Sequence, residues 1–377
     1  MISPRIRGFL AETRTDEPCL VIDLDQVRRN FEAFRHAMPE SAVYYAVKAN
    51  PHPEILRLLA NAGSNFDCAS VPEIDMALEA GATPERISYG NTIKKERDIA
   101  RAHERGVCLF AVDSHAEVEK VARAAPGAKI FCRILTDGAG AEWPLSRKFG
   151  CDPEMAIDVL ELGHRLGLKP TGISFHVGSQ QTDPAGWDNT LATAADIFRE
   201  LDTRGIRLTM VNLGGGFPTR YLKEIPTLER YGQTIYAAIR RFFGNRIPDT
   251  IIEPGRGMVG NSGVIRAEVV LVSKKSDDDP LRWVFLDIGK FGGLAETMEE
   301  AIRYVIVTER DDDVKMPCVL AGPTCDSADV LYEKTPYDLP ASLTAGDEVL
   351  IEGAGAYTST YSSVAFNGFS PLTTYVI

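Results

Sequence analysis

The sequence lacks the signatures of several large classes of protein. Its seven cysteines form no C-x-x-C pair and no even-numbered framework, which argues against a disulfide scaffold and favours reduced thiols. Its six histidines show no metal-ligand spacing, which argues against a zinc hydrolase. No run reaches membrane-spanning length, and no apolar segment follows the first arginines. We therefore expect a cytoplasmic protein without a metal site.

Positive charge is scarce relative to negative charge. The 41 Lys and Arg residues against 53 Asp and Glu residues give a net charge of −12. This balance argues against nucleic acid or a membrane as partner and suits a cationic substrate. The other proportions, 44% hydrophobic and 25% charged, are ordinary for a soluble enzyme. A chain of 377 residues is long enough for two domains, one of them barrel-sized.

Strand and helix signals alternate regularly from residue 25 to residue 260. Several of the amphipathic segments end in a glycine, the residue preferred after a helix C-terminus. The expected strands are 43–47, 65–68, 86–89, 107–112, 129–135, 172–176, 208–213 and 250–253. Eight such units predict a closed (β/α)8 TIM-like barrel, with an open doubly wound sheet as the alternative.

The pattern changes after residue 260, where strand signals follow one another with little helix between them. The expected strands are 264–273, 282–287, 318–321, 348–352 and 373–377, with one helix at 294–307. The predicted architecture is therefore α/β, with a barrel over residues 25–260 and a C-terminal all-β domain over residues 261–377. We expect the N-terminal strand, within residues 1–24, to complete the β-domain.

One lysine stands at the end of the first expected barrel strand. Lys48 ends a β-favouring run, and Pro51 and Pro53 stop the strand just beyond it. Barrel enzymes keep their chemistry at this end of the strands. We expect the lysine there to be partly desolvated, which would lower its pKa and favour Schiff-base formation. The alternative is a lysine that caps the strand and points to water.

Two later strand ends carry residues suited to bind phosphate. Gly214, Gly215 and Gly216 follow the seventh strand, where backbone N–H groups can converge around an anion. This run lacks the spacing of a dinucleotide fingerprint or a P-loop, and a permissive turn is the alternative. Arg256, after the eighth strand, can add a bidentate charge to the same phosphate.

Two ionisable side chains should face the same barrel mouth. Glu253, at the end of strand eight, suits a protonated ring nitrogen, which must hold its proton to act as an electron sink. The alternative for Glu253 is an ion pair with Arg256 that pins a loop. His176, at the end of strand six, could lie flat against a conjugated ring while Ser179 donates to a phosphate. A satisfied core histidine is the alternative for His176.

A cysteine in the β-domain is a candidate proton donor. Cys325 precedes Asp326 on an expected loop, and a thiol with an ordinary pKa of about 8.5 is usable close to neutral pH. No second histidine has a claim to serve as base for a cysteine nucleophile. The alternative is a buried structural thiol.

In their order along the chain, these segments resemble the ornithine/diaminopimelate/arginine decarboxylases, which use pyridoxal 5'-phosphate (PLP) on an alanine-racemase-like barrel followed by a β-domain. The likeness runs from residue 18 to residue 371, and residues 45–50 resemble the family's cofactor-lysine motif. It implies that Lys48 forms the Schiff base with PLP. The other residues that it places around the cofactor are Asp67, Glu73, Arg133, His176, Ser179, Gly214, Gly215, Gly216, Glu253, Arg256 and Tyr357.

The pair Cys325-Asp326 resembles the ornithine branch of this family, whereas diaminopimelate decarboxylases carry Cys-Glu-Ser at this point. In the ornithine branch the cysteine reprotonates the decarboxylated carbon and the aspartate binds the distal ammonium of the substrate. Both come from the partner subunit, so the resemblance implies a homodimer with shared active sites. Lys148 and Asp329 match a cross-subunit ion pair of that branch.

The chain departs from the eukaryotic ornithine enzymes where they have a tyrosine and then a second amine-binding aspartate. Here it has Phe291, and the second carboxylate could come from Glu296, Glu299 or Glu300. Discrimination by one methylene is worth only about 1–3 kcal/mol. We expect decarboxylation of L-ornithine to putrescine, as in polyamine biosynthesis. A lysine or lysine/ornithine decarboxylase is the alternative.

Two other functions are less well supported by the residues. Family racemases place an arginine at the ring nitrogen, where this chain has Glu253. Catalytically inactive relatives that bind protein partners commonly lose cofactor or catalytic residues, but Lys48, Cys325 and Asp326 are all present.

Overall fold

The computed structural model describes residues 2–136, 138–143 and 148–377 and divides into two compact units. The barrel comprises Arg28–Pro218 and Ile225–Met258. The β-domain comprises Met1–Val27, Thr219–Glu224 and Val259–Ile377. The boundaries differ from the expected ones mainly in the short segment Thr219–Glu224, which groups with the β-domain although it lies inside the barrel sequence.

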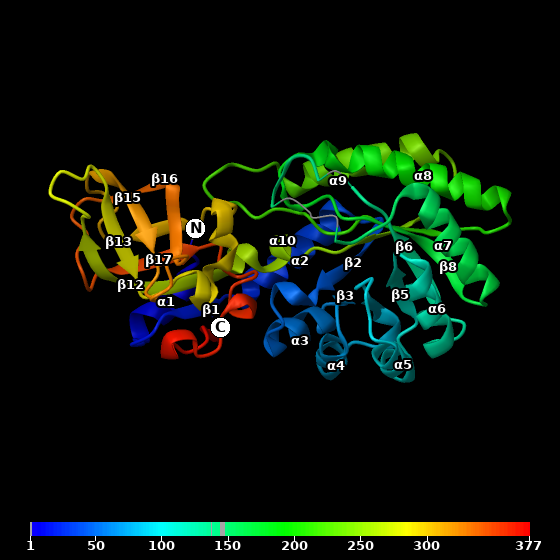
Figure 1. Cartoon of the computed structure of the whole chain (residues 1–377), viewed down its shortest axis with the longest axis horizontal. Coiled ribbons are helices and arrows are strands. Elements are labelled where there is room, and N and C mark those ends of the chain that lie inside the picture. The colour runs from blue at the N-terminus through cyan, green and yellow to red at the C-terminus, as the bar shows by residue number, and fades with distance from the viewer. Residues whose placement is uncertain (1, 137, 144–147) are drawn as a thin grey trace. The chain divides into compact units, whose positions relative to one another are not determined.

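The barrel is a closed ring of eight parallel strands in the order β10-β11-β2-β3-β4-β5-β6-β8, which confirms the barrel over the open sheet. Its strands are β2 (Ser41–Ala46), β3 (Asn65–Cys68), β4 (Ile87–Tyr89), β5 (Leu109–Val112), β6 (Lys129–Arg133), β8 (Lys169–Ser174), β10 (Met210–Asn212) and β11 (Asp249–Ile252). The helices α3 (Pro53–Asn61), α4 (Val71–Glu79), α5 (Glu96–Glu104), α6 (His115–Ala124), α7 (Pro153–Arg165), α8 (Asp188–Thr203) and α9 (Leu228–Phe243) lie outside the strands (Figure 1).

The centre of the barrel is filled by side chains. Tyr44, Ala111, Phe131, Met210 and Ile251, from five different strands, form one buried cluster. Large apolar side chains are expected there, because inward-facing residues of neighbouring strands stack in layers inside such a barrel. The interior is therefore a packed core, and functional side chains must lie at the strand ends.

The β-domain is built on a sheet in the order β14-β17-β12-β13-β15-β16, with β1 paired to β12 and β18. Its strands are β1 (Cys19–Ile22), β12 (Gly263–Ser273), β13 (Arg282–Leu286), β14 (Val305–Thr308), β15 (Lys315–Ala321), β16 (Val330–Pro340), β17 (Glu348–Glu352) and β18 (Thr373–Val376). The expected N-terminal strand thus joins this domain. The helix α1 (Pro4–Glu12), capped by Ser3, was not predicted, and its Ile6 packs in a core with Cys19 and Val264.

The predicted helix at 294–307 is wrong. The chain instead forms the irregular turns η5 (Lys290–Leu294) and η6 (Ala295–Glu300) and then strand β14. Glu299 and Glu300 have φ angles of 53° and 59°, and Gly293 has a φ of 133°. A right-handed helix cannot pass through left-handed backbone of this kind. The apolar residues in this segment therefore pack singly rather than as a helix face.

Shorter elements complete the description. The strands β7 (Ala141–Trp143) and β9 (Ser179–Gln181) pair antiparallel, α2 (Leu24–Ala37) links β1 to β2, and α10 (Arg256–Val259) follows β11. All seven cysteines are free thiols. In the described ranges, no helix combines the length and the apolar character needed to cross a bilayer. The same ranges hold no cluster of three or more metal-ligating side chains.

Candidate active site

Lys48 lies at the carboxyl end of β2, in the one-turn helix η1 (Val47–Ala49). Its neighbours Val47 and Ala49 are buried, but Lys48 itself is exposed. The turn carries Lys48 off the end of the strand, and its partial desolvation stays a prediction. The charge of Lys48 acts on Asp67, Glu253 and His176, which lie at other strand ends.

Asp67, on β3, and Glu253, just after β11, belong to the two strands that flank β2. Burial raises the pKa of both carboxyl groups, that of Glu253 to about 7, while the nearby charges of Lys48 and Arg133 oppose the shift. Ser88 is near enough to lower the pKa of Asp67 as well, yet among the described residues no aligned hydrogen bond reaches Asp67 Oδ1. Such desolvated charges at a strand end are typical of a functional site.

Arg133 ends β6 and supplies the second positive charge. Burial lowers the pKa of its guanidinium group, and Glu253 and Asp67 act in the opposite direction. Its guanidinium carbon lies 5.3 Å from the centre of the Phe149 ring. The predicted group Lys48, Asp67, Arg133 and Glu253 is therefore brought together at one end of the barrel.

His176 follows β8 and is held in one tautomer. Its Nδ1 accepts a hydrogen bond from the backbone N–H of Gly178, at 3.0 Å. Burial lowers its pKa well below the ordinary value, and the charges of Arg133 and Lys48 lower it further. The imidazole is therefore neutral near pH 7 and carries its hydrogen on Nε2.

The predicted phosphate-binding loops also meet. The φ angles of Gly214 and Gly216 are 69° and 99°, and a Cβ atom there would lie 2.0 Å from the carbonyl oxygen of Phe175 and 2.6 Å from that of Gly178. Only glycine fits such a backbone. Arg256 is buried, with 3% of its surface exposed, and its Nη2 donates to Ser179 Oγ at 3.1 Å.

Two further residues at this end of the barrel were not among the predicted site residues. Asn212 ends β10, is 1% exposed, and donates from Nδ2 to Glu253 Oε1. Its Oδ1 accepts from the backbone N–H of Gly214 at 2.9 Å. The one signal for it in the sequence is a polar side chain in an apolar strand.

Lys94 is the second of these residues, and it fits the sequence argument for a desolvated lysine better than Lys48 does. Burial lowers its pKa to about 8, while Glu117 acts against the shift. Its Nζ donates to the carbonyl oxygens of Asn91 and Ala111 at 2.9 and 2.6 Å and lies 2.9 Å from Glu117 Oε1. Two hydrogen bonds to carbonyl oxygens and a buried ion pair suit a structural role rather than a nucleophile.

Glu73, which the resemblance placed beside the cofactor, has a local structural role. At the start of α4, its Oε2 accepts from the backbone N–H of Ala69, the residue before the N-cap Ser70, at 2.6 Å. In return, Ser70 Oγ accepts from the backbone N–H of Glu73 at 3.4 Å. Burial raises the pKa of this carboxyl group.

Cys325 and Asp326 lie on an exposed loop of the β-domain between β15 and β16. The backbone N–H of Cys325 donates to Asn367 Oδ1 at 2.9 Å. Asp329, only 2% exposed, anchors the loop by accepting from Thr324 Oγ1 at 2.7 Å and from the backbone N–H of Lys290 at 2.7 Å. The ion pair between Lys148 and Asp329 stays a prediction.

The three candidate glutamates have different surroundings. Glu300 accepts from Arg303 Nη1 at 2.9 Å and from the backbone N–H groups of three β16 residues, 333–335. Glu299 is exposed and paired with Lys334. Glu296 is 4% exposed. The hydrogen-bonding capacity of Glu300 is thus used within the β-domain, which leaves Glu296 as the buried candidate.

Tyr357 has a left-handed backbone, with a φ of 57°, and its ring centre lies 5.9 Å from that of Tyr361. Tyr357 belongs to the β-domain, and its contact with a phosphate stays a prediction. A separate cavity of the β-domain, of about 200 Å³, is lined by Phe291, Thr324 and Phe366, among others.

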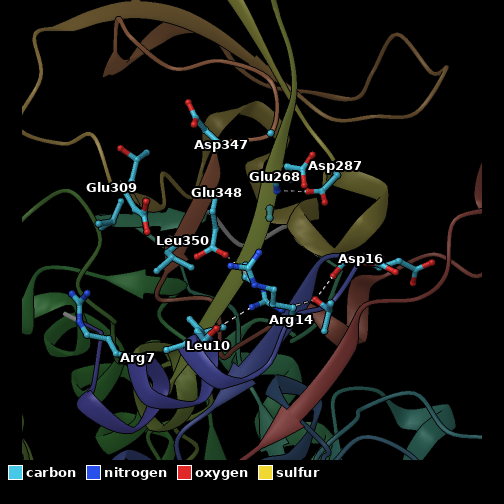
Figure 2. Close-up of a pocket in the computed structure, with 18 residues that line it drawn as sticks. Arg7, Leu10, Arg14, Asp16, Glu268, Asp287, Glu309, Asp347, Glu348 and Leu350 are labelled. Carbon is cyan, nitrogen blue, oxygen red and sulfur yellow. Dashed lines mark hydrogen bonds and ion pairs between the residues drawn. The ribbon is translucent and has the colours of Figure 1, made fainter.

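A larger cavity of the β-domain, of about 600 Å³, contains none of the predicted site residues (Figure 2). Both acidic and basic side chains line it, and several are already engaged. Arg266 donates to the carbonyl oxygen of Thr13 at 2.6 Å and lies 3.9 Å from Glu348. Asp287 Oδ1 accepts from the backbone N–H of Glu268 at 2.8 Å. Arg266 and Asp287 therefore have structural roles in the cavity wall.

Comparison with known proteins gives a consistent result. Residues 24–260 match the family described as pyridoxal-dependent decarboxylase, pyridoxal binding domain. A lysine/ornithine decarboxylase of Selenomonas ruminantium is 37% identical over 359 residues, 94% of this chain and 88% of that protein. An ornithine decarboxylase of Caenorhabditis elegans is 31% identical over 376 residues, 96% of this chain and 88% of that protein.

Solved structures agree with the sequence relatives. A lysine/ornithine decarboxylase of Vibrio vulnificus, crystallised with putrescine, has a TM-score of 0.87 and 29% identity and covers 100% of this chain and 99% of its own. Other structural neighbours were solved in complex with PLP, cadaverine or agmatine.

Proposed function

The chain belongs to the pyridoxal-dependent decarboxylase family, and on that premise we propose that it converts L-ornithine to putrescine. It is a PLP-dependent decarboxylase of basic amino acids. The observation that carries the proposal is the half-buried carboxyl group of Glu253, on which the charge of Lys48 acts at the barrel mouth. The pair Cys325-Asp326 supports ornithine as the substrate.

The residues at the barrel mouth fit PLP. A backbone cradle that admits only glycine at Gly214 and Gly216, beside the buried guanidinium of Arg256, suits a phosphate group. The neutral ring of His176 can lie against an aromatic ring without adding charge. Glu253 and Asp67 offer carboxylates to the polar edge of the same ring.

In this proposal, residues at the barrel mouth bind the cofactor. Ser179, Gly215 and Arg256 would hold the phosphate, together with Tyr357, and Lys48 supplies the amine by which the chain binds the aldehyde. When bound, PLP supplies a conjugated ring that takes up the electron pair left behind by departing CO₂. Arg133 lies near the same ring in this assignment.

Glu253 holds a proton at the ring nitrogen. A carboxyl group with a pKa of about 7 is ionised in half or more of the molecules at and above neutral pH. The ionised form stabilises a protonated nitrogen beside it, because an opposite charge within hydrogen-bonding distance favours the charged state. With PLP bound, the Glu253 carboxylate would hold a proton at the ring nitrogen in this way.

Cys325 of a partner subunit returns a proton to the substrate α-carbon, and Asp326 receives the distal ammonium. In one chain, both residues are exposed on their loop. An exposed aspartate and thiol fit a site that is completed when two copies of the chain form a homodimer.

Glu296 is the second carboxylate in this proposal. Glu300 is engaged by Arg303 and by β16, and Glu299 is exposed beside Lys334. A glutamate at this point sets the length of the pocket that receives the distal ammonium. Lysine remains the alternative substrate, which the naming of the Selenomonas and Vibrio relatives as lysine/ornithine decarboxylases supports.

Analysis of amine products tests the proposal. The PLP-loaded protein is given equal concentrations of L-ornithine, L-lysine and L-arginine, and the amines are separated by chromatography. We expect putrescine to form fastest. Cadaverine in equal or larger amount would select the lysine/ornithine alternative, and agmatine as main product would contradict both. The Lys48→Ala protein, treated in the same way, controls for background decarboxylation.

A further inference from the structure

Asn212 has both ends of its side-chain amide engaged at the barrel mouth. Its Nδ2 donates to Glu253 Oε1, and its Oδ1 accepts from the backbone N–H of Gly214 at 2.9 Å. The backbone N–H of Glu253 in turn donates to the carbonyl oxygen of Gly214 at 2.8 Å. The three residues therefore form a closed ring of hydrogen bonds.

We propose that Asn212 is a positioning residue that fixes the Glu253 carboxylate and the phosphate-binding glycine loop as one unit. The cofactor meets these two groups at opposite ends, its ring nitrogen at Glu253 and its phosphate at Gly214. The inference rests on the roles proposed above for these two residues. It adds that their separation is set before the cofactor binds.

The orientation of the amide follows from its neighbours. The backbone N–H of Gly214 can only donate, so the atom that faces it must be Oδ1. Nδ2 is then left to face the carboxylate, and its 1% exposure excludes exchange with water. Leucine has a similar volume but could form neither hydrogen bond. Aspartate would keep the shape but place a second negative charge against Glu253.

The ring also influences how Glu253 titrates. Burial and the negative charge of Asp67 raise the pKa of Glu253, whereas the hydrogen bond from Asn212 and the charges of Lys48 and Arg133 lower it. The phenol of Tyr44 faces the same carboxylate. Without the amide donor, Glu253 would ionise at a higher pH. A reaction that needs the ionised form of Glu253 should then lose activity at a higher pH as the solution is acidified.

Two variants and one control test the inference. The variants are Asn212→Leu and Asn212→Asp. The control is Asn65→Leu, which removes an asparagine of the same barrel whose Nδ2 donates to the carbonyl oxygen of Val43 at 3.1 Å, on the neighbouring strand β2. Binding of PLP to each apoprotein is measured by quenching of intrinsic fluorescence, and kcat/KM is measured as a function of pH.

We expect both Asn212 variants to bind PLP about tenfold more weakly and to shift the acid limb of kcat/KM upward by about one pH unit, as loss of a hydrogen bond to a charged group implies. Asn65→Leu should change melting temperature only. Unchanged PLP affinity and an unchanged acid limb in a folded Asn212 variant would overturn the inference.

The test does not depend on one variant or on the identity of the substrate. If Asn212→Leu does not fold, the closer match in shape, Asn212→Asp, carries the test. The affinity for PLP does not depend on which amino acid is the substrate, so this readout holds even if ornithine is not decarboxylated. A wild-type protein that binds no PLP would instead refute the proposed function itself.

Discussion

The barrel and the β-domain hold their functional residues in opposite ways. In the barrel, Asp67 is buried and Arg133, His176 and Glu253 are half-buried, and the charges of Lys48 and Arg133 act on the other three. In the β-domain, Cys325 and Asp326 stand exposed on a loop. The residues proposed to bind the cofactor are therefore largely gathered in the barrel, while those proposed for proton return and substrate recognition are exposed on the β-domain.

This difference follows from what each group must do. A cofactor site benefits from side chains that are fixed before binding, because their charges and dipoles then need no reorientation when the cofactor binds. A residue that acts across an interface must stay exposed in its own chain until the partner covers it. The buried anchor Asp329 shows that the β-domain still fixes the loop that carries the thiol.

The largest expected effect comes from removing the reactive lysine of the barrel. Lys48→Ala should reduce decarboxylase activity by about 10³-fold or more, since it removes the amine on which covalent catalysis depends. Borohydride reduction followed by peptide mass mapping should find PLP attached at Lys48 in the wild type. Attachment elsewhere, for example at the buried Lys94, would refute the assignment. Lys129→Ala, at the start of β6, is the matched control.

In the β-domain, substitution of three neighbouring glutamates tests which of them binds the substrate. Glu296→Gln should raise KM for the basic amino acid by about tenfold, because a charged hydrogen bond to the substrate is lost. Glu300→Gln should instead cost about 1–2 kcal/mol of stability, since it weakens the contacts with Arg303 and β16. Steady-state kinetics and urea unfolding separate the two effects. A larger KM effect for Glu300→Gln would reverse the assignment.

Glu299→Gln provides the control within the same turn. Its pair with Lys334 lies at the surface, where such pairs contribute little. We expect wild-type kinetics and stability. A raised KM for this variant would identify Glu299 as the second carboxylate.

The last prediction concerns the stability of the apoprotein. Because the folded pKa of Glu253, about 7, lies above its unfolded value, the folded state holds this proton more tightly. Stability should therefore fall as the pH rises from about 4.5 to 7, by about 3 kcal/mol at about 1.4 kcal/mol per pKa unit. Glu253→Gln should reduce this fall, as measured by urea unfolding at several pH values. An identical pH profile would contradict the raised pKa.

Much of the barrel was predictable because parallel strands are buried on both faces and leave continuous apolar runs in the sequence. The eight expected strands correspond to those of the barrel, and the loops with Gly214–Gly216 and Arg256 come together as the topology requires. Lys48 could be singled out because it follows a strand and precedes two prolines, and its role as the cofactor lysine stays a prediction.

The remaining features depend on contacts that no local pattern carries. The left-handed backbone of Glu299 and Glu300 is maintained by β16, which the sequence did not reveal as a strand because prolines interrupt it. Asn212 can donate to Glu253 only because β10 pairs with β11, which brings the two residues together. Lys94 is buried because Glu117 is its partner.

Complementation between two inactive variants tests the central claim, a site shared between copies of this chain. Lys48→Ala and Cys325→Ala proteins are mixed under conditions that allow subunit exchange, and decarboxylation is measured before and after. In a mixed dimer one site lacks both residues and the other lacks neither, so random pairing should restore about a quarter of the wild-type activity. No recovery, with exchange verified by mass spectrometry of the dimers, would contradict the account.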